Sequence, residues 1–172
     1  MSSLDHNLST VHHSFSIDDK DLKIGIVVSE WNTEITTALF SGCKQALLEA
    51  GIIEDHIYNV WVPGSFELPL GAKLLDGKFP LDAVICLGCV IKGETSHNEY
   101  INKAVSSALM QLSLMRNKPF VFGVLTPNDE DQAKDRAGGK YGNKGIEAAH
   151  TALKMIDLSK KMQQAEKKIG FK

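Results

Sequence analysis

The chain lacks the features that define several common classes of protein. Its 172 residues carry 19 Lys and Arg against 21 Asp and Glu, and the net charge of −2 gives no basic excess for binding nucleic acid. No apolar run approaches the roughly 20 residues that a membrane-spanning helix needs. The polar amino terminus lacks the apolar core of a secretory signal. We therefore expect a cytoplasmic protein that binds neither nucleic acid nor membrane.

Cysteine is scarce, and its pattern predicts no special chemistry. The three residues Cys43, Cys86 and Cys89 are an odd number and give no disulfide framework. Cys86 and Cys89 match the motif C-x-x-C, which in redox folds sits at a helix start. Here both lie within an apolar run, where strand residues three apart point to opposite faces. We interpret them as buried small hydrophobic residues.

Several catalytic and binding motifs are also missing. No H-E-x-x-H or clustered His, Cys and Asp spacing indicates a metal, no G-x-S-x-G indicates a serine hydrolase, and no G-x-G-x-x-G follows the first apolar run. The glycine-rich stretch 138–145, which we expect to be a loop, has Asn143 where a P-loop needs glycine. We therefore predict neither a metal site nor a nucleotide-phosphate loop.

Four apolar runs, each followed by a helical pattern, organise the chain. The predicted strands are 22–28, 58–62, 83–91 and 119–126, and the predicted helices are about 33–50, 65–75, from 97 onward, a short stretch after 128, and 146–156. Repeated strand–helix units predict an α/β fold. We expect a three-layer α/β/α sandwich around a four-stranded parallel sheet of flavodoxin-like order.

Small polar residues and glycine mark the predicted helix ends. Asn32 and Ser65 are predicted amino-terminal caps, and Gly51 follows the end of the first helix. Ser96 and Glu99 have the spacing of a capping box, so the third helix should begin near residue 97.

Two terminal segments flank the predicted domain, residues 21–158. Residues 1–20 form a polar arm, flexible or paired with a neighbouring subunit, in which the weak alternation at 13–17 predicts an extra edge strand. We interpret its histidines as solvated rather than metal-binding. Residues 159–172 form a lysine-rich tail that we expect to fray into solvent.

The turn at residues 93–100 is the most informative stretch. The predicted helix start exposes free backbone N–H groups, which form an anion site. His97 adds a titratable group in the same turn. A histidine there is often structural, so its neighbours must decide between the two interpretations.

Further candidate residues follow the other predicted strands. Because connections after parallel strands emerge at one edge of a sheet, these residues should converge with His97. They are Trp31, Ser65, Glu67, Thr95, Thr126 and Arg136. Trp31 is also compatible with a rim aromatic packed on its own helix, and Glu67 with a favourable position near a helix amino terminus.

Six motifs occur in order and together resemble a known family. They read WN at 31–32, PGSFELP at 63–69, KGETSHNEY at 92–100, FGVLT at 122–126, RAG at 136–138 and GNKG at 142–145. The set closely resembles the lumazine synthase family over residues 22–158, essentially the whole predicted domain.

The resemblance implies a reaction. Members of the family condense 5-amino-6-(D-ribitylamino)uracil with 3,4-dihydroxy-2-butanone 4-phosphate to give 6,7-dimethyl-8-ribityllumazine and phosphate, the penultimate step of riboflavin biosynthesis. Imine formation, phosphate elimination and ring closure proceed without a metal or an organic cofactor. Each step moves protons, which suits a histidine acting as acid and base. A flavodoxin-like binding module without chemistry and a purely structural shell protein are the competing hypotheses.

The resemblance also implies a role for each matching residue. His97 is the proton-transfer residue. The pyrimidine and ribityl chain would be bound by Trp31, Ser65, Phe66, Glu67, Cys89, Val90, Ile91 and Phe122. The phosphate would be bound by Glu94, Thr95 and Arg136, with Lys144 in a supporting role. Phe122 matches an aromatic supplied across a subunit boundary, so the site would need two neighbouring chains.

Assembly and three departures complete what the resemblance implies. Family members form homopentamers, and the short connection at 138–145 resembles members that build icosahedral shells, so we expect a shell, with the free pentamer as the alternative. Riboflavin synthase is a candidate partner. Trp31 stands where Phe is common, Asn98 where an aromatic is usual, and Glu94 where a small residue is frequent. We expect the Glu94 carboxylate to face solvent, because it would repel a phosphate.

Overall fold

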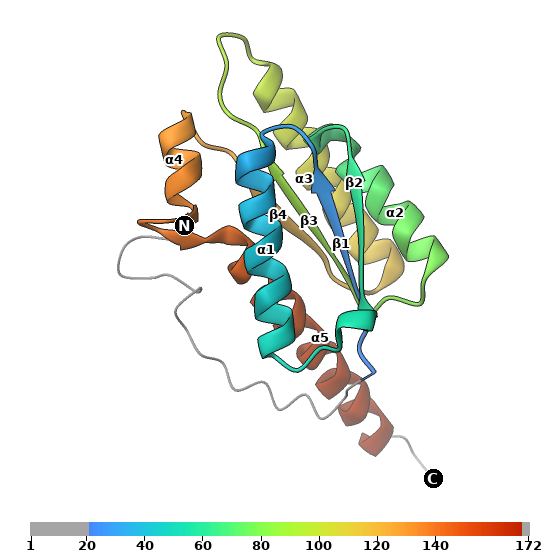
Figure 1. Ribbon diagram of the computed structural model, residues 1–172. Coiled ribbons are helices and arrows are strands. Elements are labelled where there is room, and N and C mark those ends of the chain that lie inside the picture. The colour runs from blue at the N-terminus through green and yellow to red at the C-terminus, as the bar shows by residue number, and fades with distance from the viewer. Residues whose placement is uncertain (1–20, 170–172) are drawn as a thin grey trace.

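Four parallel strands form the centre of the molecule. The computed structural model describes residues 21–169, with side chains to residue 163. The strands are β1 (Ile24–Ser29), β2 (Ile57–Val62), β3 (Ala83–Cys89) and β4 (Phe120–Leu125), and they lie in the order β2-β1-β3-β4 (Figure 1). Every neighbouring pair is parallel. The predicted four-stranded sheet of flavodoxin-like order is therefore confirmed.

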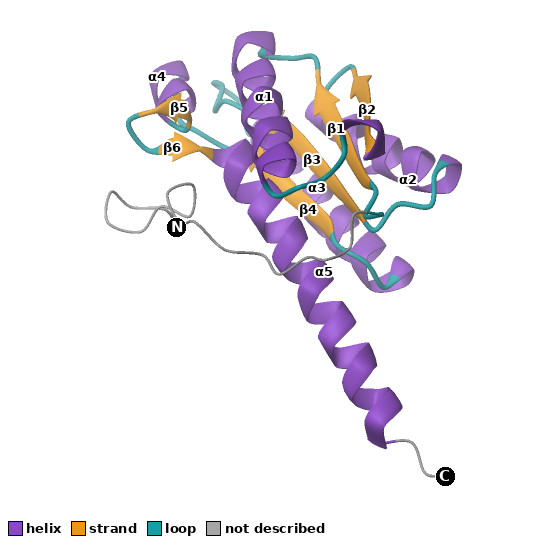
Figure 2. Ribbon diagram, turned by 60° about the horizontal axis from the view of Figure 1, so that its bottom comes forward, coloured by secondary structure: helices purple, strands orange, loops and turns teal. Residues whose placement is uncertain are grey.

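Helices cover both faces of this sheet and complete the three layers. The helices α1 (Thr33–Glu49) and α5 (Lys144–Ile169) lie on one face, and α2 (Leu68–Lys78) and α3 (His97–Arg116) lie on the other (Figures 1 and 2). Both central strands are buried along their whole length, because each has helices on its two faces. In β1, Ile26 and Val28 pack with α1 and α5, whereas Val27 packs with α2 and α3. This alternation fixes the strand between the two helical layers.

The glycine-rich stretch after α4 (Glu130–Asp135) is a hairpin rather than the expected loop. The short strands β5 (Ala137–Gly139) and β6 (Gly142–Asn143) pair antiparallel, and Gly138 and Gly142 have positive φ angles of 123° and 78°. The buried Asn143 side chain holds the hairpin in place. Its amide donates to the carbonyls of Ala38 in α1 and Ala137, and its oxygen accepts from the Gly145 N–H. Three satisfied hydrogen bonds therefore tie the hairpin to α1 and to the start of α5.

The predicted side-chain caps are wrong, although two of the helix starts are right. The helices α1 and α3 begin directly after Asn32 and Ser96, yet neither side chain bonds to its helix. Asn32 has a left-handed backbone with φ 60°, and Ser96 has φ −74° and ψ 12° instead of the extended backbone of a capping residue. Ser65 opens a short 3-10 helix, η3 (Ser65–Glu67), and is not the cap of α2. Gly51, with φ 91°, follows the end of α1 as predicted.

The last helix is longer than the sequence indicated. It continues to Ile169, so the prediction of a fraying tail from residue 159 is wrong over the described residues. Residues 159–169 contain no Gly or Pro and are rich in good helix formers, and Lys161 bonds to Asp157 one turn earlier at 2.7 Å. The helix projects well beyond the sheet (Figure 2). Residues 170–172 and the arm 1–20, with its predicted edge strand, lie outside the described residues.

One buried carboxylate joins three elements near the amino ends of the strands. Asp76 in the last turns of α2 has a side chain that is 2% exposed, and it accepts from Arg116 Nε at 2.8 Å and from Lys118 Nζ at 3.0 Å. Lys118 Nζ also donates to the Leu81 carbonyl at 2.6 Å, just before β3. The ends of α2, α3 and the connection to β3 are thus held by one charged cluster.

Replacing this carboxylate should destabilise the fold. Asp76→Ala leaves two cations near an apolar layer without their partner, and we expect a loss of about 1–3 kcal/mol in the free energy of unfolding, below the full value for a buried pair because Arg116 is half exposed. The matched control, Asp157→Ala, removes an exposed pair with Lys161 and should cost only about 0.3–0.5 kcal/mol. Urea unfolding followed by circular dichroism measures both. Equal losses in the two variants would contradict a structural role for Asp76.

Candidate functional site

A hollow of about 720 Å³ opens at the carboxyl ends of β1 and β3. It lies between the β1–α1 turn, the 3-10 helix η3, the end of β3 and the start of α3. Nine of the residues singled out in the sequence line it, namely Trp31, Ser65, Phe66, Glu67, Cys89, Val90, Ile91, Thr95 and His97. Residues from three separate stretches of the chain are therefore brought together at one edge of the sheet, as parallel strands predict.

The Trp31 indole forms one wall of the hollow. Its backbone N–H donates to the Pro63 carbonyl at 3.3 Å, which ties the β1–α1 turn to the turn after β2. A methyl group added at Gly64 would lie 3.4 Å from Trp31 Cδ1 and 3.0 Å from Glu67 Oε2. Glycine at this position thus lets the indole and the carboxylate approach the same backbone. The side chain of Trp31 is 73% exposed, so the ring is open to a stacking partner and is not a packed rim residue.

A pair of buried serines lies at and beneath the hollow, and of the two only Ser65 lines it. Ser29, at the end of β1, is fully buried, and Ser65 is 6% exposed, with the two hydroxyl oxygens 3.4 Å apart. A Cβ at Gly88 of β3 would lie 2.6 Å from Ser65 Oγ, so glycine is needed for this close approach. Ser65 lines the hollow, and its hydroxyl bonds to Ser29 beneath it instead of capping α2.

The end of β3 forms the back of the hollow. Val90 N–H donates to the Leu125 carbonyl, so the chain stays extended along β4 just past Cys89. Cys86 and Cys89 are buried in opposite cores, which confirms the interpretation as small hydrophobic residues. Burial raises the pKa of Cys89 to about 11 and also raises the pKa of Cys86 and of Cys43. None of these thiols is suited to act as a nucleophile at neutral pH.

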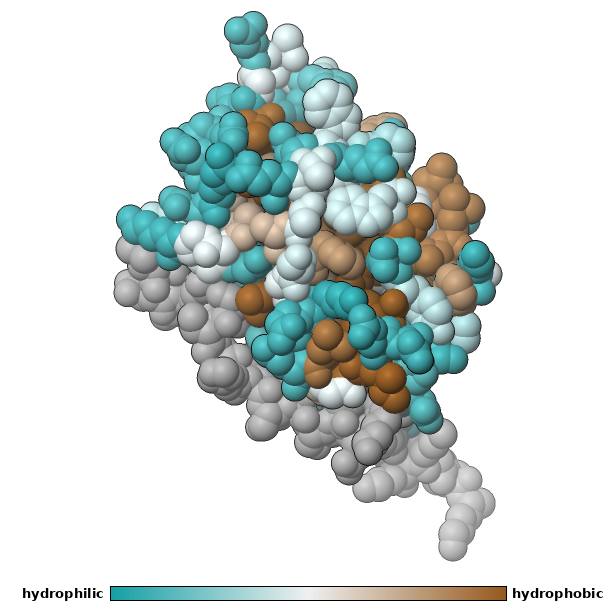
Figure 3. All heavy atoms as spheres, viewed as in Figure 1, coloured by the Kyte–Doolittle hydropathy of each residue, from teal (hydrophilic) through white to brown (hydrophobic). Residues whose placement is uncertain are grey.

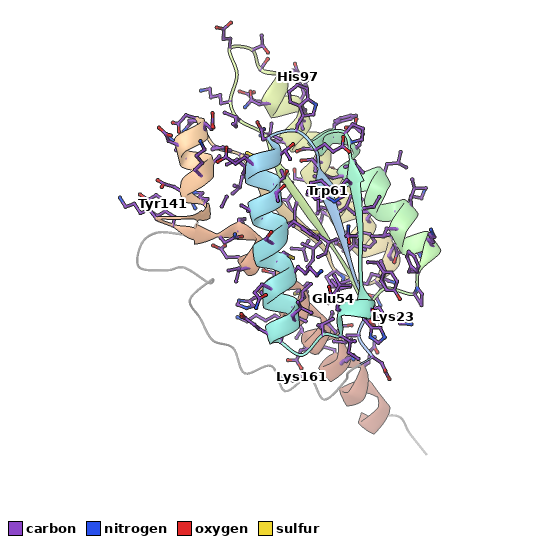
Figure 4. All side chains as sticks on the ribbon, viewed as in Figure 1. Lys23, Glu54, Trp61, His97, Tyr141 and Lys161 are labelled. Carbon is purple, nitrogen blue, oxygen red and sulfur yellow. The ribbon has the colours of Figure 1, made fainter. Side chains whose placement is uncertain are left out.

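The start of α3 faces the hollow from the solvent side. The His97 N–H donates to Thr95 Oγ1 at 3.4 Å, and the N–H groups of Glu99 and Tyr100 donate to the Ser96 carbonyl. The Ser96 side chain caps none of them, and the start of α3 presents the positive end of the helix dipole, which favours an anion. His97, Thr95 and Glu94 are all exposed, and Figure 4 shows His97 beside the turn at the top of the molecule. Glu94 does not line the hollow, which agrees with the expectation that its carboxylate faces solvent.

Four further predicted site residues do not line the first hollow: Thr126, Arg136, Phe122 and Lys144. Thr126 is exposed and does not line the hollow. Arg136 ends α4, with its guanidinium 5.3 Å from the centre of the Tyr141 ring, and its carbonyl accepts from the Lys144 N–H. Figure 4 places Tyr141 on a different side of the molecule from His97. Within one chain Arg136 is therefore not brought to the anion turn.

Phe122 and Lys144 line a second hollow of about 510 Å³, between α3, the outer edge of β4 and α5. Most of its lining is apolar, including Leu109, Met110, Leu114 and Met155. Lys144 bonds to the buried Glu147 at 2.9 Å. The predicted site residues thus form two groups on different sides of the monomer.

The sequence prediction assigned no site role to Asn32, Tyr100 and Ile101, whose side chains also line the first hollow. Tyr100 and Ile101 reach it from the first turns of α3, and Tyr100 is 73% exposed. Asn32 was interpreted as a cap, yet its side chain donates to the Cys89 carbonyl. The sequence feature that could have indicated a site role for Asn32 is its position directly after Trp31, at the end of a buried strand.

Two findings bear on other classes of function. Among residues 21–169, no group of three His, Cys, Asp or Glu side chains is arranged to hold a metal ion. Over the same residues, no helix has both the length and the apolar character that crossing a membrane requires.

The thiols offer a direct check on the interior. At pH 8 a pKa of about 11 leaves about one Cys89 side chain in a thousand ionised, and the other two thiols are also buried. We expect iodoacetamide to label the native protein far more slowly than a free thiol, and to label three cysteines after unfolding in guanidinium, as counted by mass spectrometry. Rapid labelling of native Cys86 or Cys89 would instead indicate a reactive C-x-x-C pair.

Comparison with known proteins identifies similar chains. A family model described as 6,7-dimethyl-8-ribityllumazine synthase matches residues 21–160. A protein of that name from Cytophaga hutchinsonii is 54% identical over 157 residues, which cover 91% of this chain and 98% of its own length. Proteins of the same name from Parabacteroides distasonis and Thermus thermophilus are each 47% identical, over 153 residues (89% of this chain, 96% of theirs) and 139 residues (81% and 88%) respectively.

Proposed function

The chain belongs to the 6,7-dimethyl-8-ribityllumazine synthase family, and on this premise we propose how its first hollow carries out the family's reaction. The protein condenses 5-amino-6-(D-ribitylamino)uracil with 3,4-dihydroxy-2-butanone 4-phosphate to give 6,7-dimethyl-8-ribityllumazine and phosphate in riboflavin biosynthesis. The observation that supports this site is the meeting of an exposed indole, the buried Ser65 and the start of α3 with His97 around one hollow.

The aminouracil occupies the part of the hollow next to β1 and β3. The Trp31 ring stacks on the pyrimidine, and the backbone of residues 89–91 reads the uracil edge. Ser65, Phe66 and Glu67 line the side toward η3, where a hydroxyl and a carboxylate suit the hydroxyl groups of a ribityl chain. The three contact types together would orient the 5-amino group toward the start of α3.

The phosphorylated ketone occupies the side next to α3. Its phosphate is bound by the amide groups at the helix start, including those of Glu94 and Thr95, and by the Thr95 hydroxyl. His97 transfers protons as the imine forms, phosphate leaves and the ring closes, because imidazole exchanges protons readily near neutral pH. No step requires a metal or an organic cofactor.

A second copy of the chain completes the site. The first hollow is open, with Trp31 and His97 exposed, whereas Phe122, Lys144 and Arg136 lie on another side of the same monomer. We assign these three residues to the hollow of a neighbouring chain, where Arg136 adds positive charge beside the phosphate and Lys144 has a supporting role. A phosphate held in one chain by amides and the Thr95 hydroxyl would thus gain a charge-assisted contact in the assembly.

Apolar surfaces support this assembly. Phe66, Leu70 and Leu74 form an exposed stripe on η3 and α2, and Figure 3 shows apolar side chains gathered at that edge of the molecule. A second apolar surface, near the second hollow, includes Met110, Leu114, Met155 and Leu158 on α3 and α5. Contact between two different surfaces is heterologous, and it gives a ring when the rotation between successive copies closes.

The assembly proposed here is a homopentamer, with pentamers joined into an icosahedral shell in the cytoplasm and riboflavin synthase as the enzyme that receives the product. Light scattering separates the outcomes, because a shell is many times heavier than a single pentamer.

Replacing the histidine should slow the reaction without preventing binding. We expect His97→Ala to lower kcat by about 10²-fold, at the low end of the range for acid–base catalysis, with KM for both substrates changed little. His56→Gln is the matched control, since His56 lies before β2 at the opposite end of the sheet. Lumazine fluorescence and phosphate release measure turnover. Unchanged turnover for His97→Ala would remove the residue from the mechanism.

Mixed assemblies should restore activity if the site is shared. We expect His97→Ala and Arg136→Ala each to be weakly active alone, the latter through a raised KM for the phosphorylated ketone. After joint unfolding and refolding in equal amounts, about one site in four would combine two unaltered residues from different chains. We expect that share of wild-type activity at low ketone concentration. No gain over the separately refolded variants would place Arg136 outside the site or within the same chain's site.

A further inference from the structure

Asn32 has an unusual backbone at the edge of the first hollow. Its φ and ψ angles are 60° and 48°, in the left-handed region, and among the described residues Asn117 is the only other non-glycine residue with positive φ. Its side-chain Nδ2 donates to the Cys89 carbonyl at 2.9 Å, across 57 positions of sequence. Asparagine tolerates the left-handed conformation better than most non-glycine residues. The residue type at position 32 therefore affects both the backbone conformation and the hydrogen bond to Cys89.

The hydrogen bond lies where the sheet can no longer hold β3. The pairing of β1 with β3 ends at Val28 and Leu87, because the chain leaves the sheet after Ser29. On the other side β3 remains paired with β4, through Cys89 and Leu125. The last residues of β3 are therefore supported on one side by a strand and on the other by the Asn32 side chain.

We infer that Asn32 is a positioning residue that aligns the two halves of the pyrimidine site. It directly follows Trp31, the proposed stacking ring, and it binds the first residue of the segment 89–91, the proposed reader of the uracil edge. The Asn32 side chain thus fixes the position of the Trp31 ring relative to the segment 89–91 that binds the uracil edge. Because Asn32 occupies the Cys89 carbonyl and the Val90 N–H donates to the Leu125 carbonyl, the backbone of Ile91 is left to provide polar groups for the substrate. This inference rests on the proposed function.

Three substitutions separate the hydrogen bond from the backbone strain. Asn32→Gly keeps the left-handed backbone and removes the hydrogen bond. Asn32→Ala removes the bond and also strains the backbone, since alanine disfavours positive φ. Asn32→Asp keeps the shape but turns an oxygen toward the Cys89 carbonyl, so attraction becomes repulsion.

The expected effects differ between binding and stability. KM for the aminouracil should rise about 3- to 10-fold in Asn32→Gly and Asn32→Ala, as for the loss of one hydrogen bond, and further in Asn32→Asp. KM for the phosphorylated ketone should change less than 2-fold. The melting temperature should fall by about 2–4 °C in Asn32→Ala relative to Asn32→Gly. KM for the aminouracil should therefore separate Asn32→Asp from the other two variants, whereas melting temperature should separate Asn32→Ala from Asn32→Gly.

A matched control and a direct binding measurement complete the experiment. Asn117→Gly removes the other left-handed asparagine, which ends α3, and should keep wild-type kinetics. Quenching of tryptophan fluorescence by the aminouracil should weaken in the Asn32 variants in proportion to KM, with Trp31→Ala identifying the signal of that ring. A wild-type aminouracil KM in Asn32→Gly, or a KM that follows melting temperature across the series, would overturn the inference. Absence of turnover and of quenching in the wild-type protein would instead overturn the proposed function.

Discussion

The parallel direction of the four strands is the constraint on which the rest of the molecule depends. Because every strand points the same way, every connection that follows a strand begins at the same edge of the sheet. The central strands β1 and β3 are buried on both faces, so their ends cannot move far without disturbing both cores. Side chains that are far apart in sequence, such as Trp31, Ser65 and His97, are thereby held around one hollow.

The same order of strands explains why one chain holds only part of the proposed site. The first hollow lies over β1 and β3, the inner strands, whereas Phe122 belongs to β4, whose outer edge is unpaired within the described residues. Both an open hollow with an exposed indole and an uncovered strand edge are unfavourable for an isolated molecule. Association of two copies would remove both at once. Burial of apolar surface and completion of the site would then depend on the same contact.

Much of the fold could be predicted because it follows from strong, repeated patterns. Buried runs such as 83–91, with a helical period after each, specify strands and helices and, through the handedness of their connections, a parallel sheet. The resemblance of six motifs identified most of the hollow's lining. The tail and the hairpin were missed for different reasons. Helix propensity and an ion pair between Asp157 and Lys161 carried α5 past the point where core burial ends, and the hairpin depends on Asn143, whose three long-range or turn contacts no local pattern reveals.

The wrong capping predictions share one location, and that location has a physical meaning. Asp129, away from the first hollow, caps α4 as local rules require, with its carboxylate accepting from the Gln132 N–H at 2.8 Å. Asn32, Ser65 and Ser96 stand beside the hollow, and none of them caps a helix.

At each of the three positions the polar groups make a contact other than a side-chain cap. Asn32 bonds to β3, Ser65 bonds to Ser29 beneath the hollow, and the Ser96 carbonyl accepts from the Glu99 N–H at the start of α3. Local capping rules therefore fail where these polar residues make tertiary or turn contacts beside the hollow, and the pattern of failure itself marks the site.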